Sequence, residues 1–150
     1  MCGIIGYIGS EDVREVLLDA LELLEYRGYD SAGIALRDEE SGKTEVRKCA
    51  GRVSDLRAIC ASEKVVSQCG IGHTRWATHG GVNDCNAHPH QVGKVTLVHN
   101  GIIENYRELI ADYDLADTLK SETDSEVVAA LLNRFYEGNP EEAIKKTVSK

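Results

Sequence analysis

The chain opens with Met1-Cys2-Gly3-Ile4-Ile5-Gly6, in which a cysteine follows the first methionine and precedes a short apolar run. The apolar run, bounded by glycines, predicts a β-strand over residues 3–8. Removal of Met1 would give Cys2 a free α-amine beside its thiol. Because an α-amine titrates at about pH 7.7–8.0, it can accept the thiol proton and leave a nucleophilic thiolate. The stretch therefore predicts a strand that begins at a nucleophile with its own base.

Composition sets the broad class of the protein. The chain has 150 residues, 42% of them hydrophobic, and a formal net charge of −8, which predicts one soluble domain with a real core. This acidity disfavours nucleic-acid and anionic-membrane partners, which need clustered Lys and Arg. No apolar run reaches the ~20 residues of a membrane span, and no secretory signal is visible. Five irregularly spaced cysteines argue against a disulfide framework and indicate the cytoplasm.

Helical and strand patterns alternate along the rest of the chain. Ser10 is expected to cap a helix that ends near Gly28, where a left-handed glycine would close it. Strands over 32–37 and 44–48 predict a hairpin, and a long loop follows the strand over 68–74. The remaining expected elements are a helix over 53–61, a strand over 95–99 and three further helices. These three helices begin at Asn105, which has a capping box, at Thr123 or Asp124, and at Pro140. The number of strands predicts sheets with helices outside, an α+β fold.

Three further clusters supply groups that suit amide chemistry. Arg75 follows a strand and precedes a glycine-rich segment, where it can hold a carboxylate through two hydrogen bonds. Asn100 and the Gly101 N–H can provide two donors to a developing oxyanion. Asp124, at the start of a helix, can receive an ammonium group. Together with Cys2, these groups fit an α-amino acid with a side-chain amide, which is glutamine or asparagine.

Other interpretations of the same residues stay open from the sequence alone. Arg27 and Asp30 can form a surface pair, residues 72–81 can be an ordinary surface loop with one buried Trp, and Asn-Gly is commonly just a turn. A zinc site is a further alternative, because Asp84, Cys85, His88 and His90 lie close together. Their spacing matches no familiar zinc pattern, and Pro89 should make the two histidine side chains diverge, so no metal site is expected. His73 and His99 are expected to be packed or hydrogen-bonded near the strands.

The combination of motifs resembles one family closely. The chain is similar to the class II, N-terminal-nucleophile glutamine amidotransferases, and in particular to the glutaminase domains of glutamine–fructose-6-phosphate aminotransferases. The motifs that carry this resemblance, besides residues 1–6, are Glu25-Tyr26-Arg27-Gly28-Tyr29-Asp30-Ser31-Ala32-Gly33, Gly72-His73-Thr74-Arg75-Trp76-Ala77-Thr78-His79-Gly80, Asn86-Ala87-His88-Pro89-His90, His99-Asn100-Gly101-Ile102-Ile103-Glu104-Asn105 and Ser121-Glu122-Thr123-Asp124.

The resemblance implies an N-terminal-nucleophile (Ntn) hydrolase fold, an α/β/β/α sandwich, and a set of residue roles without a cofactor. Cys2 is the nucleophile, and Asn100 with the Gly101 N–H forms the oxyanion hole. The glutamine carboxylate is held by Arg75 with Thr78 and His79, and its ammonium group by Asp124. Trp76 gates the passage of ammonia, and Arg27 orders the region of the nucleophile.

The resemblance spans residues 1–150 and also implies what lies outside them. Members of the family continue through more strands of the glutaminase domain and then two sugar-isomerase domains, so the sandwich is expected to be incomplete on its C-terminal side. Fructose 6-phosphate would be reached only through the missing isomerase domains, and a homodimer is possible. The alternative to a glutamine-hydrolysing enzyme is an inactive fragment that keeps the fold or only the affinity for glutamine.

Overall fold

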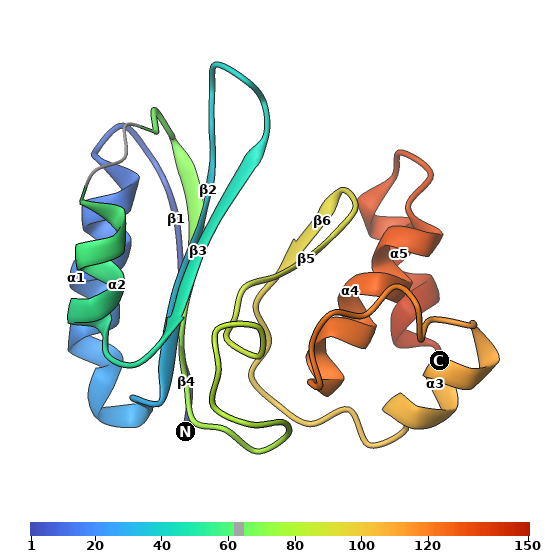
Figure 1. The fold of residues 1–150 in the computed structure, drawn as a ribbon. Coiled ribbons are helices and arrows are strands. Elements are labelled where there is room, and N and C mark those ends of the chain that lie inside the picture. The colour runs from blue at the N-terminus through green and yellow to red at the C-terminus, as the bar shows by residue number, and fades with distance from the viewer. Residues whose placement is uncertain (62–64) are drawn as a thin grey trace.

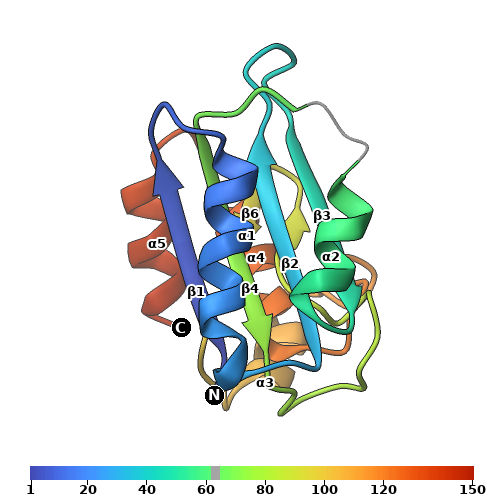
Figure 2. The same cartoon turned by 90° about the vertical axis from the view of Figure 1, so that its left-hand side faces the viewer.

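A four-stranded antiparallel sheet forms one half of the molecule. The computed structural model describes residues 1–61 and 65–150. The sheet has the strand order β1-β4-β2-β3, and helices α1 and α2 cover one of its faces (Figures 1 and 2). The bounds are β1 Gly3–Ile8, α1 Val13–Leu24, a 3₁₀ turn η1 Glu25–Arg27, β2 Ser31–Arg37, β3 Thr44–Ala50, α2 Val53–Cys60 and β4 Cys69–Arg75.

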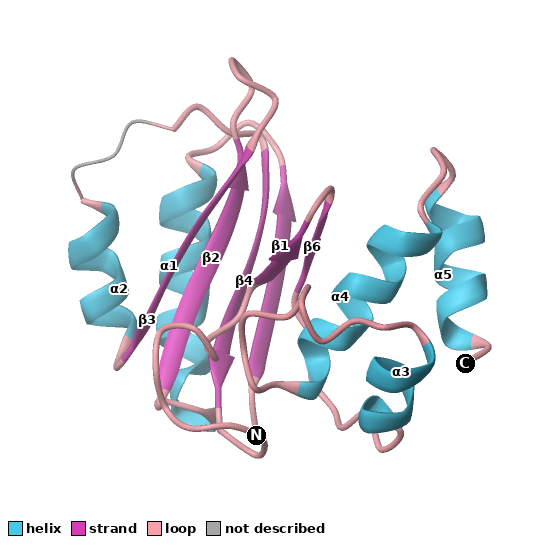
Figure 3. Ribbon diagram, turned by 45° about the vertical axis from the view of Figure 1, so that its right-hand side comes forward, coloured by secondary structure: helices cyan, strands magenta, loops and turns pink. Residues whose placement is uncertain are grey.

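The opposite face of this sheet looks toward a second, smaller layer. A hairpin of β5, His90–Val92, and β6, Val95–Leu97, lies between the sheet and helix α4 (Figure 1). Helices α3, Tyr106–Asp112, α4, Asp124–Phe135, and α5, Pro140–Val148, form the outer layer (Figure 3). The layers therefore follow the expected order of helix, sheet, sheet and helix. None of the described helices is long and apolar enough to cross a membrane.

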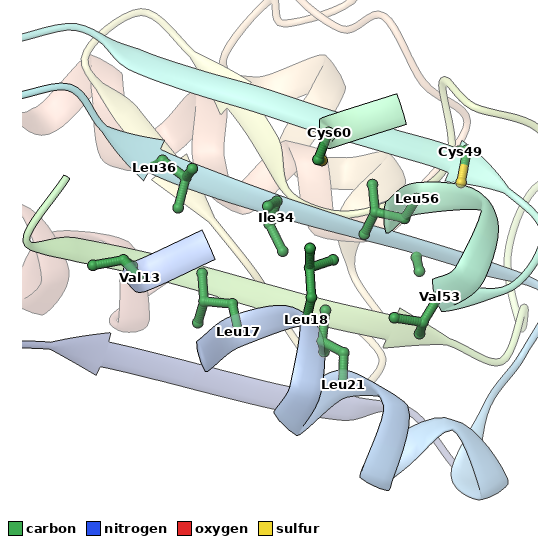
Figure 4. Packing of buried hydrophobic residues seen from close by; sticks show 11 residues of the cluster. Val13, Leu17, Leu18, Leu21, Ile34, Leu36, Cys49, Val53, Leu56 and Cys60 are labelled. Carbon is green, nitrogen blue, oxygen red and sulfur yellow. The ribbon is translucent and has the colours of Figure 1, made fainter. Parts of the chain in front are cut away.

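The main core fills the space between α1, α2 and the four-stranded sheet. Leu17, Leu18 and Leu21 of α1 are completely buried and meet Ile34 of β2 and Leu56 of α2 (Figure 4). Burying each such side chain contributes roughly 1.5–3 kcal/mol. The sequence pattern predicted the helix but not the central place of Leu18. A second cluster, around Val127 and Leu131 of α4, packs against β5, β6 and α3.

Two sequence predictions about the ends of α1 are wrong. The helix is capped by Asp12 and not by Ser10, because the Asp12 carboxylate accepts from the backbone N–H groups of Arg14 and Glu15. Gly28 is extended, at φ −169°, and not left-handed. A Cβ there would lie 2.8 Å from the backbone carbonyl carbon and oxygen of Arg75, so the glycine permits the close approach of two chain segments.

The second half of the chain departs from the predictions in similar ways. Strand β5 was hidden in the expected long loop because it has only three residues. The Asn105 side chain makes no capping bond and donates to the Lys150 carbonyl at 3.0 Å. Thr123 precedes α4 but hydrogen-bonds His90 instead of capping. The start of α5 is confirmed, since Asn139 accepts from two backbone N–H groups beside Pro140.

The packing of α1 gives a direct test of the core. Leu18→Ala should lower the free energy of unfolding by about 2–5 kcal/mol, because it removes a fully buried side chain from a close-packed interface. Leu23→Ala, on the same helix but 78% exposed, is the matched control and should change it by less than about 0.5 kcal/mol. Urea denaturation of both variants measures the difference, and equal effects would contradict this assignment of the core.

Candidate active site

One cavity of about 250 Å³ is lined by nearly all of the predicted site residues. It lies where the start of β1, the end of β4, the loop after β6 and the first residues of α4 meet. All predicted site residues except Arg27 line it: Cys2, Arg75, Trp76, Thr78, His79, Asn100, Gly101 and Asp124. A larger hollow of about 810 Å³ lies between the β2–β3 hairpin, the β5–β6 hairpin and α5, and it contains none of these residues.

The Cys2 side chain is held at the edge of the cavity by the pairing of β1 with β4. The register sets Gly3 opposite Thr74, which brings Cys2 beside the chain that leaves β4. The Trp76 N–H donates to the Cys2 Sγ at 3.2 Å, and the Asn100 Nδ2 donates to the Cys2 carbonyl at 3.1 Å. The predicted nucleophile and a candidate oxyanion donor are thus neighbours.

Arg27 touches the N-terminus rather than the cavity. Its carbonyl accepts from the Met1 α-amine at 2.7 Å, and its Nη2 lies 3.8 Å from the Met1 Sδ. The alternative surface pair with Asp30 does not form. The Asp30 carboxylate instead accepts from the Ala77 N–H and from the Ser31 hydroxyl, so it holds the start of the loop after β4.

Arg75 is a buried cation whose hydrogen-bond partners are neutral. Its side chain is 4% exposed, and its guanidinium donates to the carbonyls of Gly81, at 3.1 Å, and His79. No carboxylate among the described residues forms an ion pair with it. Because a buried charge is costly without a counter-charge, this arrangement favours an anionic ligand group. Thr78 and His79, which are hydrogen-bonded to each other at 3.3 Å, lie on the same loop.

Asp124 places a negative charge in the wall of the same cavity. It is the first residue of α4 and is 3% exposed. Its Oδ2 accepts from the Ile103 N–H at 2.6 Å, and the amino end of the helix also stabilises the carboxylate. This bond ties the helix to the loop that carries Asn100 and Gly101. The cavity can therefore accept a ligand with one anionic and one cationic group.

Trp76 is exposed and not buried, contrary to the alternative of a surface loop around a buried tryptophan. Half of its surface, 51%, is accessible, and its ring meets the edge of Tyr29 at a centroid distance of 5.9 Å. It stands next to the sulfur of Cys2 at the rim of the cavity. A ligand that enters the cavity can cover this apolar surface.

A group of histidines in the wall of the cavity was not identified as part of the site from the sequence. His73 stacks on His88 at 4.2 Å, and His88 lies 4.4 Å from His90, so the expected divergence of the last two side chains is wrong. The His99 Nδ1 is hydrogen-bonded to the Ser125 Oγ at 3.0 Å. The His99 ring also packs against Gly101, where an added Cβ would lie 2.8 Å from the His99 Nε2. The alternation along β4, which turns His73 away from α1, was the one available signal.

The zinc alternative fails because its proposed ligands face different partners. Asp84 accepts from the Ala50 N–H at 2.7 Å, and the Cys85 thiol donates to the Lys120 carbonyl at 3.0 Å. His90 bonds the Thr123 hydroxyl at 2.9 Å. Across residues 1–61 and 65–150, no three His, Cys, Asp or Glu side chains are grouped to hold a metal ion.

Comparison with known proteins decides the family. The family described as the glutamine amidotransferase domain matches residues 35–143, a range that includes Arg75, Asn100 and Asp124. The chain belongs to the glutamine amidotransferase family. It is 54% identical, over 99% of its length, to a glutamine–fructose-6-phosphate aminotransferase of Bacillus licheniformis, and 56% identical over 95% to that of Halalkalibacterium halodurans. This amidotransferase chain spans about a quarter of the length of those relatives.

Solved structures of related amidotransferases share the fold. An allosteric regulatory enzyme of purine biosynthesis superposes with a TM-score of 0.83 and 27% identity, over 99% of this chain and 33% of that one. The glutamine phosphoribosylpyrophosphate amidotransferase of B. subtilis gives a TM-score of 0.80 and 25% identity, over 99% and 32%. The predicted α+β Ntn fold is therefore confirmed.

Burial keeps three histidines neutral: His73 and His88, which line the cavity, and His90, which contacts His88. It lowers the pKa of His73 to about 4 and that of His90 to about 3, and lowers the pKa of His88 further still. The charge of the nearby Arg75 acts in the same direction on all three. Both ring nitrogens of His73 are buried and have no hydrogen-bond partner in the described structure. Protonation of this group therefore opposes folding.

The stability of the amidotransferase domain should fall as the pH drops from about 7 to about 5. The unfolded state takes up protons below a pKa of about 6.5, whereas the folded histidines stay neutral, so stability is lost as the pH falls toward the folded values. The slope that each histidine contributes rises toward about 1.4 kcal/mol per pH unit as the pH falls below about 6. Urea denaturation across the range measures it. His73→Phe should flatten the profile, and an unchanged slope in that variant would contradict the assignment.

Proposed function

We propose that this amidotransferase domain hydrolyses the side-chain amide of glutamine to glutamate and ammonia through a γ-glutamyl thioester on Cys2. The observation that carries the proposal is the buried Arg75, which has no carboxylate partner within residues 1–61 and 65–150 and shares one cavity with Asp124 and Cys2. The carboxylate of a bound α-amino acid supplies the anion that Arg75 lacks, and its ammonium group supplies a cation for Asp124. Its side chain is then directed toward the sulfur.

The first half of the reaction forms the thioester and releases ammonia. After removal of Met1, the α-amine of Cys2 accepts the thiol proton, and the thiolate adds to the amide carbon. The negative charge that develops on the amide oxygen is stabilised by the Asn100 Nδ2 and the Gly101 N–H. The α-ammonium group then gives its proton to the leaving nitrogen, the C–N bond breaks, and ammonia departs.

The second half regenerates the enzyme. The α-amine of Cys2 takes a proton from water, and the resulting hydroxide adds to the thioester carbon at the same oxyanion donors. The C–S bond breaks, glutamate leaves, and the thiolate recovers its proton. Throughout, the substrate is held by Arg75, with Thr78 and His79, at its carboxylate and by Asp124 at its ammonium group. Trp76 covers the bound substrate, and Arg27 orders the N-terminal residues.

The names of the relatives support a place for this reaction in amino-sugar synthesis. We propose that residues 1–150 are the glutaminase part of a larger synthase and that the released ammonia aminates fructose 6-phosphate bound by sugar-isomerase domains. Those domains correspond to parts of the relatives beyond the matched quarter. A cytoplasmic location suits the chain, since all five of its cysteines are free thiols.

Cys2→Ala should abolish glutamate release from glutamine, because no other group forms the thioester. Cys85→Ala, which removes an exposed cysteine outside the cavity, is the matched control and should keep full activity. An enzymatic assay for glutamate measures both variants. Intact mass must show that Met1 is absent, and 6-diazo-5-oxo-L-norleucine, a diazoketone analogue of glutamine, should label Cys2. Protein that lacks Met1 yet neither releases glutamate nor reacts at Cys2 would sink the proposal.

Asp124→Asn should lower kcat/KM for glutamine by about 10- to 100-fold, because a charge-assisted bond to the substrate ammonium group is lost. The amide oxygen can still accept from the Ile103 N–H, so the local fold is retained. Glutaramate, which lacks the α-amino group, should be hydrolysed equally slowly by both proteins. Asp117→Asn, at an exposed position, is the control variant. Equal losses for the two substrates would contradict the role of Asp124.

A further inference from the structure

Two residues outside the cavity hold the loop that follows β4. The Asn86 side chain is 1% exposed, and its Nδ2 donates to the Gly81 carbonyl at 3.0 Å and to the Glu122 Oε2 at 2.9 Å. Its Oδ1 accepts from the Glu122 backbone N–H at 2.9 Å. The same Glu122 oxygen accepts from the Gly81 N–H at 3.3 Å. Asn86 thus uses both amide hydrogens and its oxygen to join two segments that are distant in sequence.

The two joined segments carry opposite sides of the substrate site. Gly81, on one side, also accepts from the guanidinium of Arg75 through its carbonyl. Glu122, on the other side, lies two residues before Asp124 in a continuous stretch. A shift in the bond between Asn86 and Glu122 therefore changes the position of the Arg75 loop relative to Asp124.

Charge and close packing both make this connection specific. Hydrogen bonds from the Asn86 amide and the Gly81 N–H lower the pKa of the Glu122 carboxyl, so these bonds are charge-assisted at neutral pH. The loop also passes directly over the amide, because a Cβ at Gly80 would lie 2.7 Å from the Asn86 Nδ2. Gly80 has φ +76°, a conformation that other residues adopt only with strain.

We propose that Asn86 and Glu122 are positioning residues that set the separation between the Arg75 guanidinium and the Asp124 carboxylate. Neither residue lines the cavity, so both act through the loop and the start of α4. The inference rests on the proposed function, in which those two groups take the charged ends of glutamine. It assigns a role to two residues of the Asn86–His90 and Ser121–Asp124 motifs that the chemical steps do not use.

Glu122→Ala tests the role at an exposed position, where removal of the side chain leaves the core intact. We expect KM for glutamine to rise about tenfold or more while kcat changes less than about threefold, because binding is lost and the chemistry is kept. Glu108→Ala, an exposed glutamate on α3, is the matched control and should match the unsubstituted chain. A coupled assay for glutamate gives kcat and KM, and thermal unfolding confirms that each variant is folded.

An introduced negative charge and its rescue separate positioning from a loss of structure. Asn86→Asp sets two carboxylates against each other and should raise KM at least as much as Glu122→Ala. Adding Glu122→Gln restores an amide donor between the two side chains and should recover about tenfold in KM. A kcat that falls with KM unchanged, or a double variant no better than Asn86→Asp alone, would overturn the proposal.

The outcomes also distinguish this inference from the proposed function. If the unsubstituted chain releases glutamate and both single variants keep its KM, only the positioning role is overturned. If the unsubstituted chain, without Met1, neither hydrolyses glutamine nor reacts with its diazoketone analogue, the proposed function is overturned and this inference falls with it.

Discussion

The buried guanidinium of Arg75 is the constraint on which the candidate site depends. It lies at the end of a central strand, where little water reaches it, and in the described part of the chain its hydrogen-bond partners are the backbone carbonyls of residues 79 and 81. A cation in this position must draw oxygen atoms around itself, so the loop after β4 wraps back over its own strand. The loop in turn brings Thr78 and His79 to the cavity. The charge of Arg75 therefore determines the course of the loop and also favours a ligand with an anionic group.

The pairing of β1 with β4 brings Cys2 to the cavity that Arg75 also lines. A shift of one residue in the register would turn Cys2 to the other face of the sheet, away from the cavity. Gly3 permits the pairing, because a Cβ there would meet the Thr74 hydroxyl at 2.7 Å. The hydrogen bond from the Trp76 N–H to the Cys2 sulfur then continues the contact between these two segments beyond the paired residues of β1 and β4. The position of the sulfur is thus a property of the sheet and not of a flexible terminus.

Local chemistry made some features predictable from the sequence, and long-range contacts hid others. Asn139 and Pro140 start a helix through bonds within four residues, so their pattern was sufficient. The role of Gly28 depends on Arg75, which lies far along the chain, and periodicity cannot reveal it. The gathering of eight predicted site residues at one cavity could be expected because the motifs resemble a family. The stack of His73 on His88 could not, since it joins a strand to a loop with no repeating pattern.

The neutral histidines explain how one buried cation can be maintained in the wall of the candidate site. If the imidazoles of His73 and His88 were charged, they would face Arg75 as like charges in a region with little water, and the cost would be several kcal/mol. Burial keeps them neutral, so the positive charge of the wall stays on Arg75 at neutral pH. Acid acts on the molecule in two separable ways. In the proposed mechanism, protonation of the Cys2 α-amine would remove the base, whereas protonation of the histidines opposes folding itself. Under that proposal, loss of activity on the acid side has a catalytic cause in the α-amine and a structural cause in the histidines.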